Sequence, residues 1–296
     1  MKRWQAGLSL ALVAFLAACG APAGTDGDLV DDWPALGKPG VPVPAIGQCW
    51  TGAASAEKLE PGSGMKAVDC AADHATETFH VGSFTGTTAQ GSVPPAGAQL
   101  ADAYSTCDQQ AKSFLDGDWH DGRLVLRVFT PTEAQWRGEA RFFRCDLIEV
   151  SDDNGTVFTR KASLKDTLDG SRPIALGCVQ VKTDGDGFID DFVPIACEQQ
   201  HNGEYVGTFY SPDARPYPSD AGARRSLLQP GCKALVAKFL GLTEAQFDTN
   251  QQLSFAWSTA HQSRWEYGDR SARCYLMLEG KLSVGRSLKG NGNAPI

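Results

Sequence analysis

One motif occurs twice in this chain, and its recurrence constrains the fold more than any other feature of the sequence. The motif is a cysteine, a histidine four positions later and a glutamate three positions after that, followed closely by a Val-Gly pair. Its two copies are Cys70, His74, Glu77 and Cys197, His201, Glu204. A repeat of about 100 residues has the size of a domain and is too long for a solenoid unit. We therefore predict two tandem copies of one module.

The first nineteen residues have the features of a bacterial export signal. Lys2 and Arg3 precede a mostly apolar run over residues 8–16, which is too short to span a bilayer as a permanent helix. The run ends at Leu16-Ala17-Ala18-Cys19, which resembles the lipobox of bacterial lipoproteins. This resemblance implies that Cys19 becomes the lipidated first residue of the mature chain. Several acyl chains would anchor the protein stably, so we expect it at the extracytoplasmic face of the cell membrane.

Eight of the nine cysteines remain for the repeats, four in each. They are Cys49, Cys70, Cys107 and Cys145, then Cys178, Cys197, Cys232 and Cys274. Cysteines of an exported protein usually pair, so we predict two disulfides per module. Four cysteines allow three pairings in each module, and the sequence leaves the choice open. We favour pairing the first cysteine with the second and the third with the fourth.

Changes in composition divide the chain into five segments. Residues 1–19 form the signal peptide. Residues 20–45 are rich in proline, glycine, alanine and aspartate and cannot bury enough apolar surface to order themselves, so they form a disordered tether. The two modules are expected at residues 46–150 and 175–282, and residues 283–296 as a flexible tail.

Periodicity within each module predicts the order strand, strand, helix, strand, strand. Apolar residues recur at three- and four-residue steps over 100–114 and again over 232–239, which is typical of one helix face. Cys107 and Cys232 lie on these faces. Residues 123–128 and 253–257 alternate as strands do. Each module is therefore expected to be α+β, a small antiparallel sheet with one packed helix.

The motifs of both copies, taken together, resemble a known family. The first copy contains Gly47-x-Cys49, the Cys70 motif, and Pro131-x4-Trp136-x-Gly138-x5-Arg144-Cys145. The second contains Gly177-Cys178, the Cys197 motif, and Trp265-x2-Gly268-x4-Arg273-Cys274, with Ala260 in place of the proline. This set resembles the septum-formation-related domain of actinobacterial envelope proteins. The resemblance implies a cell-envelope location and a link to cell division, and it implies no catalytic residues.

The histidine–glutamate pairs are the strongest candidates for a site. His74 with Glu77, or His201 with Glu204, could form an imidazole–carboxylate pair that acts as a general base or binds a metal. Their recurrence favours a structural role, because a duplicated scaffold keeps what folding needs. In that role the histidine would staple a turn beside a disulfide, and the glutamate would fix its tautomer.

Two matched tryptophans, Trp136 and Trp265, each precede a cysteine by nine residues. They could stack on sugar rings as exposed platforms or pack in the core. Their matched positions near a loop-to-strand boundary favour the core.

The sequence predicts neither a metal nor a cofactor. A structural zinc site needs four ligands, and disulfide formation would consume the cysteines of the Cys-x3-His pattern. The acidic run from Asp184 to Asp191 would place Phe188 and Ile195 at the fifth and twelfth positions of a calcium loop, where ligands are required. We interpret this run as a solvated turn.

Charge and motifs leave two functions open. The formal net charge is -8 without any basic block, so we expect no nucleic-acid partner. The favoured function is a non-enzymatic envelope lipoprotein whose modules bind a partner protein or a cell-wall component. The alternative is an enzyme that acts on wall polymers through a His/Glu site in one module.

Overall fold

The computed structural model describes residues 40–52, 54–59, 64–212 and 215–296. The predicted signal peptide, the Cys19 lipidation site and most of the predicted tether lie outside these residues. Gly40–Ile296 group together as one unit that contains both modules. Within the described part of the chain, no helix is both long and apolar enough to cross a membrane.

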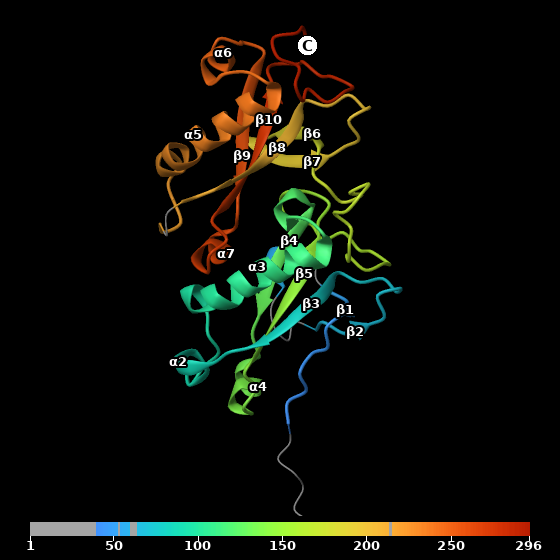
Figure 1. Cartoon of the computed structure of the whole chain (residues 1–296), viewed down its shortest axis with the longest axis vertical. Coiled ribbons are helices and arrows are strands. Elements are labelled where there is room, and N and C mark those ends of the chain that lie inside the picture. Colours follow the sequence, from blue (N-terminus) through green and yellow to red (C-terminus); the bar gives the residue numbers. More distant parts are fainter. Residues whose placement is uncertain (1–39, 53, 60–63, 213–214) are drawn as a thin grey trace, which may run out of the picture. The chain divides into compact units, whose positions relative to one another are not determined.

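The first module is an antiparallel sheet with a helix across one face (Figure 1). Its described strands, in the order β2-β1-β3-β5-β4, form a five-stranded sheet. The strands are β1 (Gln48–Trp50), β2 (Ala67–Val68), β3 (Thr76–Ser83), β4 (Leu124–Phe129) and β5 (Phe142–Glu149). The helices are α2 (Gly86–Ala89), α3 (Ala101–Leu115), α4 (Glu133–Arg137) and the 3-10 turns η1 (Ala56–Lys58), η2 (Gly97–Leu100) and η3 (Trp119–Asp121).

The second module repeats this topology strand for strand. Its described strands form a sheet in the order β7-β6-β8-β10-β9, and α5 lies across it as α3 does in the first module (Figure 1). The strands are β6 (Cys178–Thr183), β7 (Ile189–Pro194), β8 (Gly203–Tyr210), β9 (Leu253–Thr259) and β10 (Ser271–Leu278). The helices are α5 (Ala221–Leu240), α6 (Glu244–Asp248) and α7 (Gln262–Glu266).

The α+β class and the antiparallel sheets are confirmed, with one strand more per module than the sequence predicted. The additional strands, β2 and β7, pair with the first strand of each module as hairpins. The Asp184 carboxylate caps the second hairpin by accepting from the backbone N–H groups of Asp186 and Phe188. The acidic run is therefore a turn, as predicted.

The disulfides follow the favoured pairing in both modules. The bonds join Cys49 to Cys70, Cys107 to Cys145, Cys178 to Cys197, and Cys232 to Cys274. The second bond of each module ties the buried face of its helix to the strand beneath, and both of its sulfurs are fully buried. In the first bond of each module, one cysteine is buried and the other is partly exposed.

Each module ends in a segment that packs back onto it, and we call residues 160–168 and 284–292 the closing segments. Arg160 pairs with the backbone of His74, and Val284 pairs with the backbone of His201. Further along, the amides of Leu168 and Gly292 donate to the last carbonyl groups of α3 and α5. Each closing segment thus joins the histidine turn to the C-terminal end of the module's helix.

The closing segments correct two predicted boundaries. Leu164 and Leu288 are 1% and 2% exposed and lie in the hydrophobic cores of their modules. Residues 283–296 are consequently part of the second module rather than a flexible tail, and the first module extends past residue 150. The buried leucine of each closing segment explains the difference, because its side chain completes the core.

Candidate functional site

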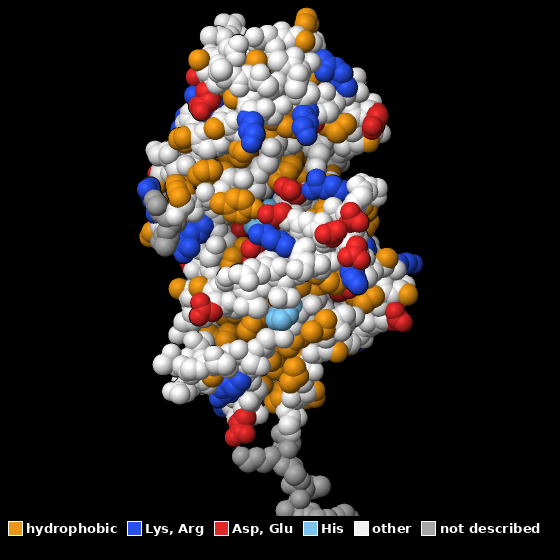
Figure 2. Space-filling model, viewed as in Figure 1, with side chains coloured by type: hydrophobic (Ala, Val, Ile, Leu, Met, Phe, Trp, Pro, Cys, Tyr) orange, Lys and Arg blue, Asp and Glu red, His pale blue; other side chains and the backbone are white. Residues whose placement is uncertain are grey.

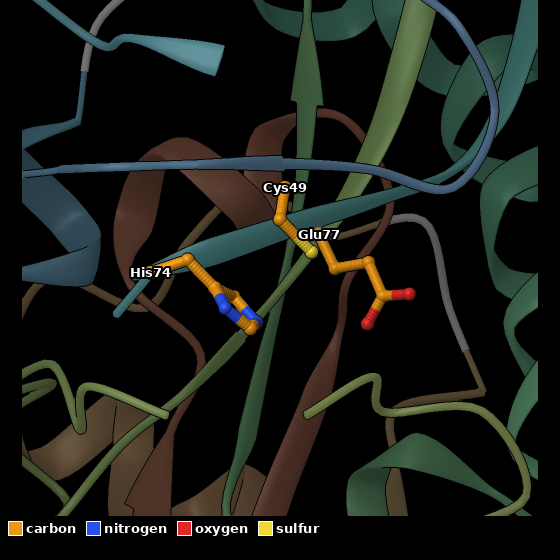
Figure 3. Close-up of side chains that lie close together, drawn as sticks. All are labelled: Cys49, His74 and Glu77. Carbon is orange, nitrogen blue, oxygen red and sulfur yellow. The ribbon is translucent and has the colours of Figure 1, made fainter. Parts of the chain in front are cut away.

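Each module gathers a cysteine, a histidine and a glutamate at one buried point. Figure 3 shows the side chains of Cys49, His74 and Glu77 converging from β1, the turn before β3, and β3 itself. One potential ligand atom from each of the three lies within 4.8 Å of the others, and the same holds for Cys178, His201 and Glu204. We call these two groups the Cys–His–Glu clusters.

The glutamates of the clusters hold the closing segments. The two carboxylate oxygens of Glu77 accept from the Ser163 hydroxyl and the Leu164 amide, both at 2.6 Å. Glu204 accepts in the same way from Ser287 and Leu288. Since both glutamates are almost fully buried, these hydrogen bonds satisfy charges that would otherwise be costly to bury. The structural interpretation of the glutamates therefore fits the geometry, although their partners differ from the expected histidine.

The histidines are fixed by backbone carbonyl groups instead. His74 Nδ1 lies 2.9 Å from the Ala72 oxygen, and His201 Nδ1 lies 2.8 Å from the Gln199 oxygen. A carbonyl oxygen can only accept, so Nδ1 carries the proton in both rings. Each Nε2 then presents a lone pair, and it is buried without a hydrogen-bond partner among the described residues.

The two tryptophans lie in the core, as the sequence favoured. Trp136 and Trp265 are each 1% exposed. Their indole N–H groups donate to the carbonyl oxygens of Gly91 and Arg215, at 2.7 and 2.9 Å. They hold loops to the sheet in this structure and do not present stacking surfaces.

Sequence reasoning missed the polar surface through which the two modules contact each other, which we call the junction. The Arg273 guanidinium of β10 donates to the carbonyl oxygens of Gly122 and Leu124, at 3.0 and 2.7 Å, and lies 3.3 Å from Asp153. Tyr205 donates to Asp121 at 2.7 Å. Figure 2 shows side chains of both charge signs close together at the level where the modules meet. The Arg-Cys repeat was the only sequence signal that pointed to any of these residues.

Two basic side chains, those of Arg264 and His120, lie between carboxylates at the junction. Arg264 contacts Glu57 at 3.1 Å and Asp269 at 3.0 Å. His120 contacts Asp118 at 2.7 Å through Nδ1, and its Nε2 lies 3.5 Å from Asp269. Asp269 therefore joins both basic side chains and is itself 1% exposed.

The carboxylates around His120 favour its charged form. Burial alone would lower the pKa of His120, but its hydrogen bond with Asp118 and the nearby Asp269 carboxylate outweigh that effect and raise the pKa above 6.5. Burial also opposes ionisation of Asp269, yet the neighbouring His120 and the charge of Arg264 hold its pKa at about 2. Asp269 is consequently ionised at neutral pH, and the surrounding carboxylates favour the charged form of His120.

We expect this network to make stability depend on pH in a defined direction. A histidine with a raised folded-state pKa stabilises fully below its unfolded pKa, and this contribution disappears as the pH rises through the folded value. Asp269 behaves oppositely, and its contribution disappears as the pH falls below about 4. Urea unfolding across pH should show His120→Gln approaching the wild type in stability at alkaline pH. If the difference in unfolding free energy between the wild type and His120→Gln stays constant as the pH rises above 6.5, a charged His120 is contradicted.

The first module has an open groove where the second module has the junction. Arg144 precedes Cys145 on β5 as Arg273 precedes Cys274 on β10, so the two arginines occupy equivalent positions. The Arg144 guanidinium lies over the Trp50 ring at 4.2 Å and pairs with Asp146 at 3.0 Å. The groove beside it has a volume of about 340 Å³, and its apolar walls include Met65 and Phe142.

The fold and its clusters define a class of protein: two α+β modules, each with two internal disulfides, joined through a polar junction. A family model described as "Septum formation" matches residues 46–274 in one stretch. The chain belongs to this septum formation family, as the sequence motifs suggested, and the match covers the first module and the second module as far as Cys274. Comparisons with curated proteins and with solved structures gave no match.

Proposed function

We propose that this chain is a lipid-anchored, non-enzymatic protein of the cell envelope that takes part in septum formation by binding a partner protein. The family gives the link to septum formation. The resemblance of residues 16–19 to a lipobox supports the anchor, and the disulfides fit an extracytoplasmic location. The binding role requires no cofactor.

The groove beside Arg144 is the observation that carries the binding role. At the equivalent place in the second module, Arg273 is covered by backbone carbonyl groups of residues 120–124. In the first module, Arg144 Nε is buried without a hydrogen-bond partner among the described residues, and Trp50, Met65 and Phe142 line a hollow beside it. A partner segment that offers carbonyl groups to Arg144 and apolar side chains to the hollow would fit here. It would bind Arg144 as the carbonyl groups of the first module bind Arg273. Aromatic and arginine side chains are frequent at the centres of interfaces.

The alternative, an enzyme acting on wall polymers, fits the geometry less well. A general acid or base must reach its substrate, and Glu77 and Glu204 are 2% and 6% exposed. Both carboxylates already accept two hydrogen bonds from their closing segments.

The test follows the protein in growing cells with a fluorescent domain joined after Ile296 through a linker. We expect enrichment at septa for the wild type and for Lys66→Glu, which adds a glutamate at an exposed neighbouring position. Met65→Glu places the same charge at the groove and should lose that enrichment at equal protein level. Uniform wild-type signal would contradict the septal role. Equal behaviour of the two variants would contradict the groove as the binding surface.

A second measurement addresses the enzyme directly. Purified wild type should release no more soluble fragments from isolated cell walls than Glu77→Gln combined with Glu204→Gln. Wall-lytic activity that this double variant loses would support the enzyme and overturn the proposal.

A further inference from the structure

The Cys–His–Glu clusters have a property that the disulfide-bonded fold does not use. Each histidine has its Nδ1 proton on a backbone carbonyl group and an Nε2 lone pair that is buried without a hydrogen-bond partner among the described residues. Metal-binding histidines in proteins are oriented in this way, since the second nitrogen donates to a carbonyl or carboxylate. In Figure 3 the His74 ring lies beside the Cys49 sulfur and the Glu77 carboxylate.

The disulfide beside each cluster can be opened while the buried helix-to-sheet disulfide of the same module stays closed. Cys70 and Cys197 are partly exposed, whereas both sulfurs of Cys107–Cys145 and of Cys232–Cys274 are fully buried. Thiol–disulfide exchange requires access to the sulfur that is attacked. A small dithiol can therefore reach Cys70 or Cys197 and cannot reach the helix-to-sheet bonds.

We propose that the dithiol form of each cluster is a metal site for Zn²⁺ or a similar divalent ion, and that this ion and the first disulfide of the module are alternatives to each other. In the first module the ligands are Cys49, Cys70, His74 and Glu77. In the second they are Cys178, Cys197, His201 and Glu204.

The reductive step balances with a dithiol as electron donor. Its thiolate attacks the Cys70 sulfur, the bond to Cys49 breaks, and Cys49 leaves as a thiolate. The second thiol of the donor then releases Cys70, so the donor becomes a disulfide while the two cysteines gain two electrons. On metal binding, the Cys70 thiol loses its proton to solvent.

The donor set suits zinc in type and number. Two thiolates, one neutral imidazole and one carboxylate provide four ligands, the number of a closed tetrahedral site. Glu77 can contribute while it holds Ser163 and Leu164, because each carboxylate oxygen has a second lone pair. The expectation of no metal from the sequence rested on oxidised cysteines, and it still applies to the disulfide form.

The first experiment measures bound zinc by mass spectrometry on the full mature chain. The protein is treated anaerobically with a reductant, desalted, exposed to Zn²⁺ and freed of excess metal. We expect one ion per module in the reduced protein and none in the oxidised protein. His74→Ala with His201→Ala should lose both ions, whereas His80→Ala, on β3 but outside the cluster, should lose none. Co²⁺ in place of Zn²⁺ should give thiolate charge-transfer absorption only in the reduced protein.

A second variant keeps the test decisive if full reduction unfolds the chain. Cys70→Ser with Cys197→Ser frees Cys49 and Cys178 without any reductant and retains both buried disulfides. It should bind zinc under air-saturated conditions and lose it on His74→Ala with His201→Ala. The proposal is overturned if this variant binds no zinc, or if zinc remains after the histidines are replaced. The proposal is also overturned if the oxidised wild type binds as much zinc as the reduced wild type. None of these outcomes depends on the proposed septal role.

Discussion

Replacing Arg264 with alanine should destabilise the protein by about 3–5 kcal/mol, because it removes the cation that pairs Glu57 with the buried Asp269. Glu57 and Asp269 contact this guanidinium from the two modules, and Asp269 is almost fully buried. Removal of one member of a buried ion pair is costly because the charge that remains is neither solvated nor paired. Urea unfolding of Arg264→Ala at neutral pH gives the change in free energy directly.

A matched exposed pair provides the control for that measurement. Arg137 and Glu133 form an ion pair in α4 with both side chains 72% exposed, so Arg137→Ala should change stability by about 0–1 kcal/mol. Adding Asp269→Asn to Arg264→Ala should recover part of the loss, since it removes one of the stranded charges. An Arg264→Ala variant that is as stable as Arg137→Ala would show that the junction does not hold the modules together.

Deleting residues 283–296 should destabilise the protein strongly, with a loss of about 2–5 kcal/mol from the buried leucine alone. The deletion removes Leu288 from the core of the second module. It also leaves Glu204 without Ser287 and the Leu288 amide, and His201 loses its backbone pairing with Val284. Thermal unfolding should show a much lower midpoint, or no folded second module.

A shorter deletion shows whether the loss of stability comes from the packed residues or only from shortening the chain. Removing residues 293–296 leaves every one of these contacts in place and takes only the partly buried Ile296 from the edge of the core, so it should lower the unfolding temperature much less. Leu288→Ala in the full chain should reproduce about 2–5 kcal/mol of the loss. If the long and the short deletion behave alike, the last residues are a tail after all.

The helix faces, the tandem modules and the disulfide pairing could be predicted because each leaves a local or repeated pattern. Residues 100–114 place Cys107 on the apolar face of one helix, and the second copy places Cys232 in the same way. A helical cysteine on the buried face can only meet the sheet beneath it. The pairing with Cys145 and Cys274 is therefore consistent with periodicity, while the final choice among three pairings required the three-dimensional structure.

Other features of the fold could not be predicted from the sequence, for physical reasons. Strand β2 has two residues, too few for any periodicity. The junction joins His120 to Asp269 and Arg264 to Glu57 through contacts between different modules. None of these four residues is a repeated position of the motifs. The closing segments were detectable in principle, because Ser163-Leu164-Lys165 recurs as Ser287-Leu288-Lys289. The repeat defined by the cysteine motifs ends at Cys145 and Cys274, before these segments begin.

The closing segments also set the order in which the modules can finish folding as the chain emerges from its N-terminus. The first module contains its own closing segment, so it can complete its core before the second module has emerged. The second module cannot do so until residues 284–292 are free, because Leu288 belongs to its core. Until then Glu204 lacks the Ser287 hydroxyl and the Leu288 amide as hydrogen-bond partners. The second module should therefore mature after the first.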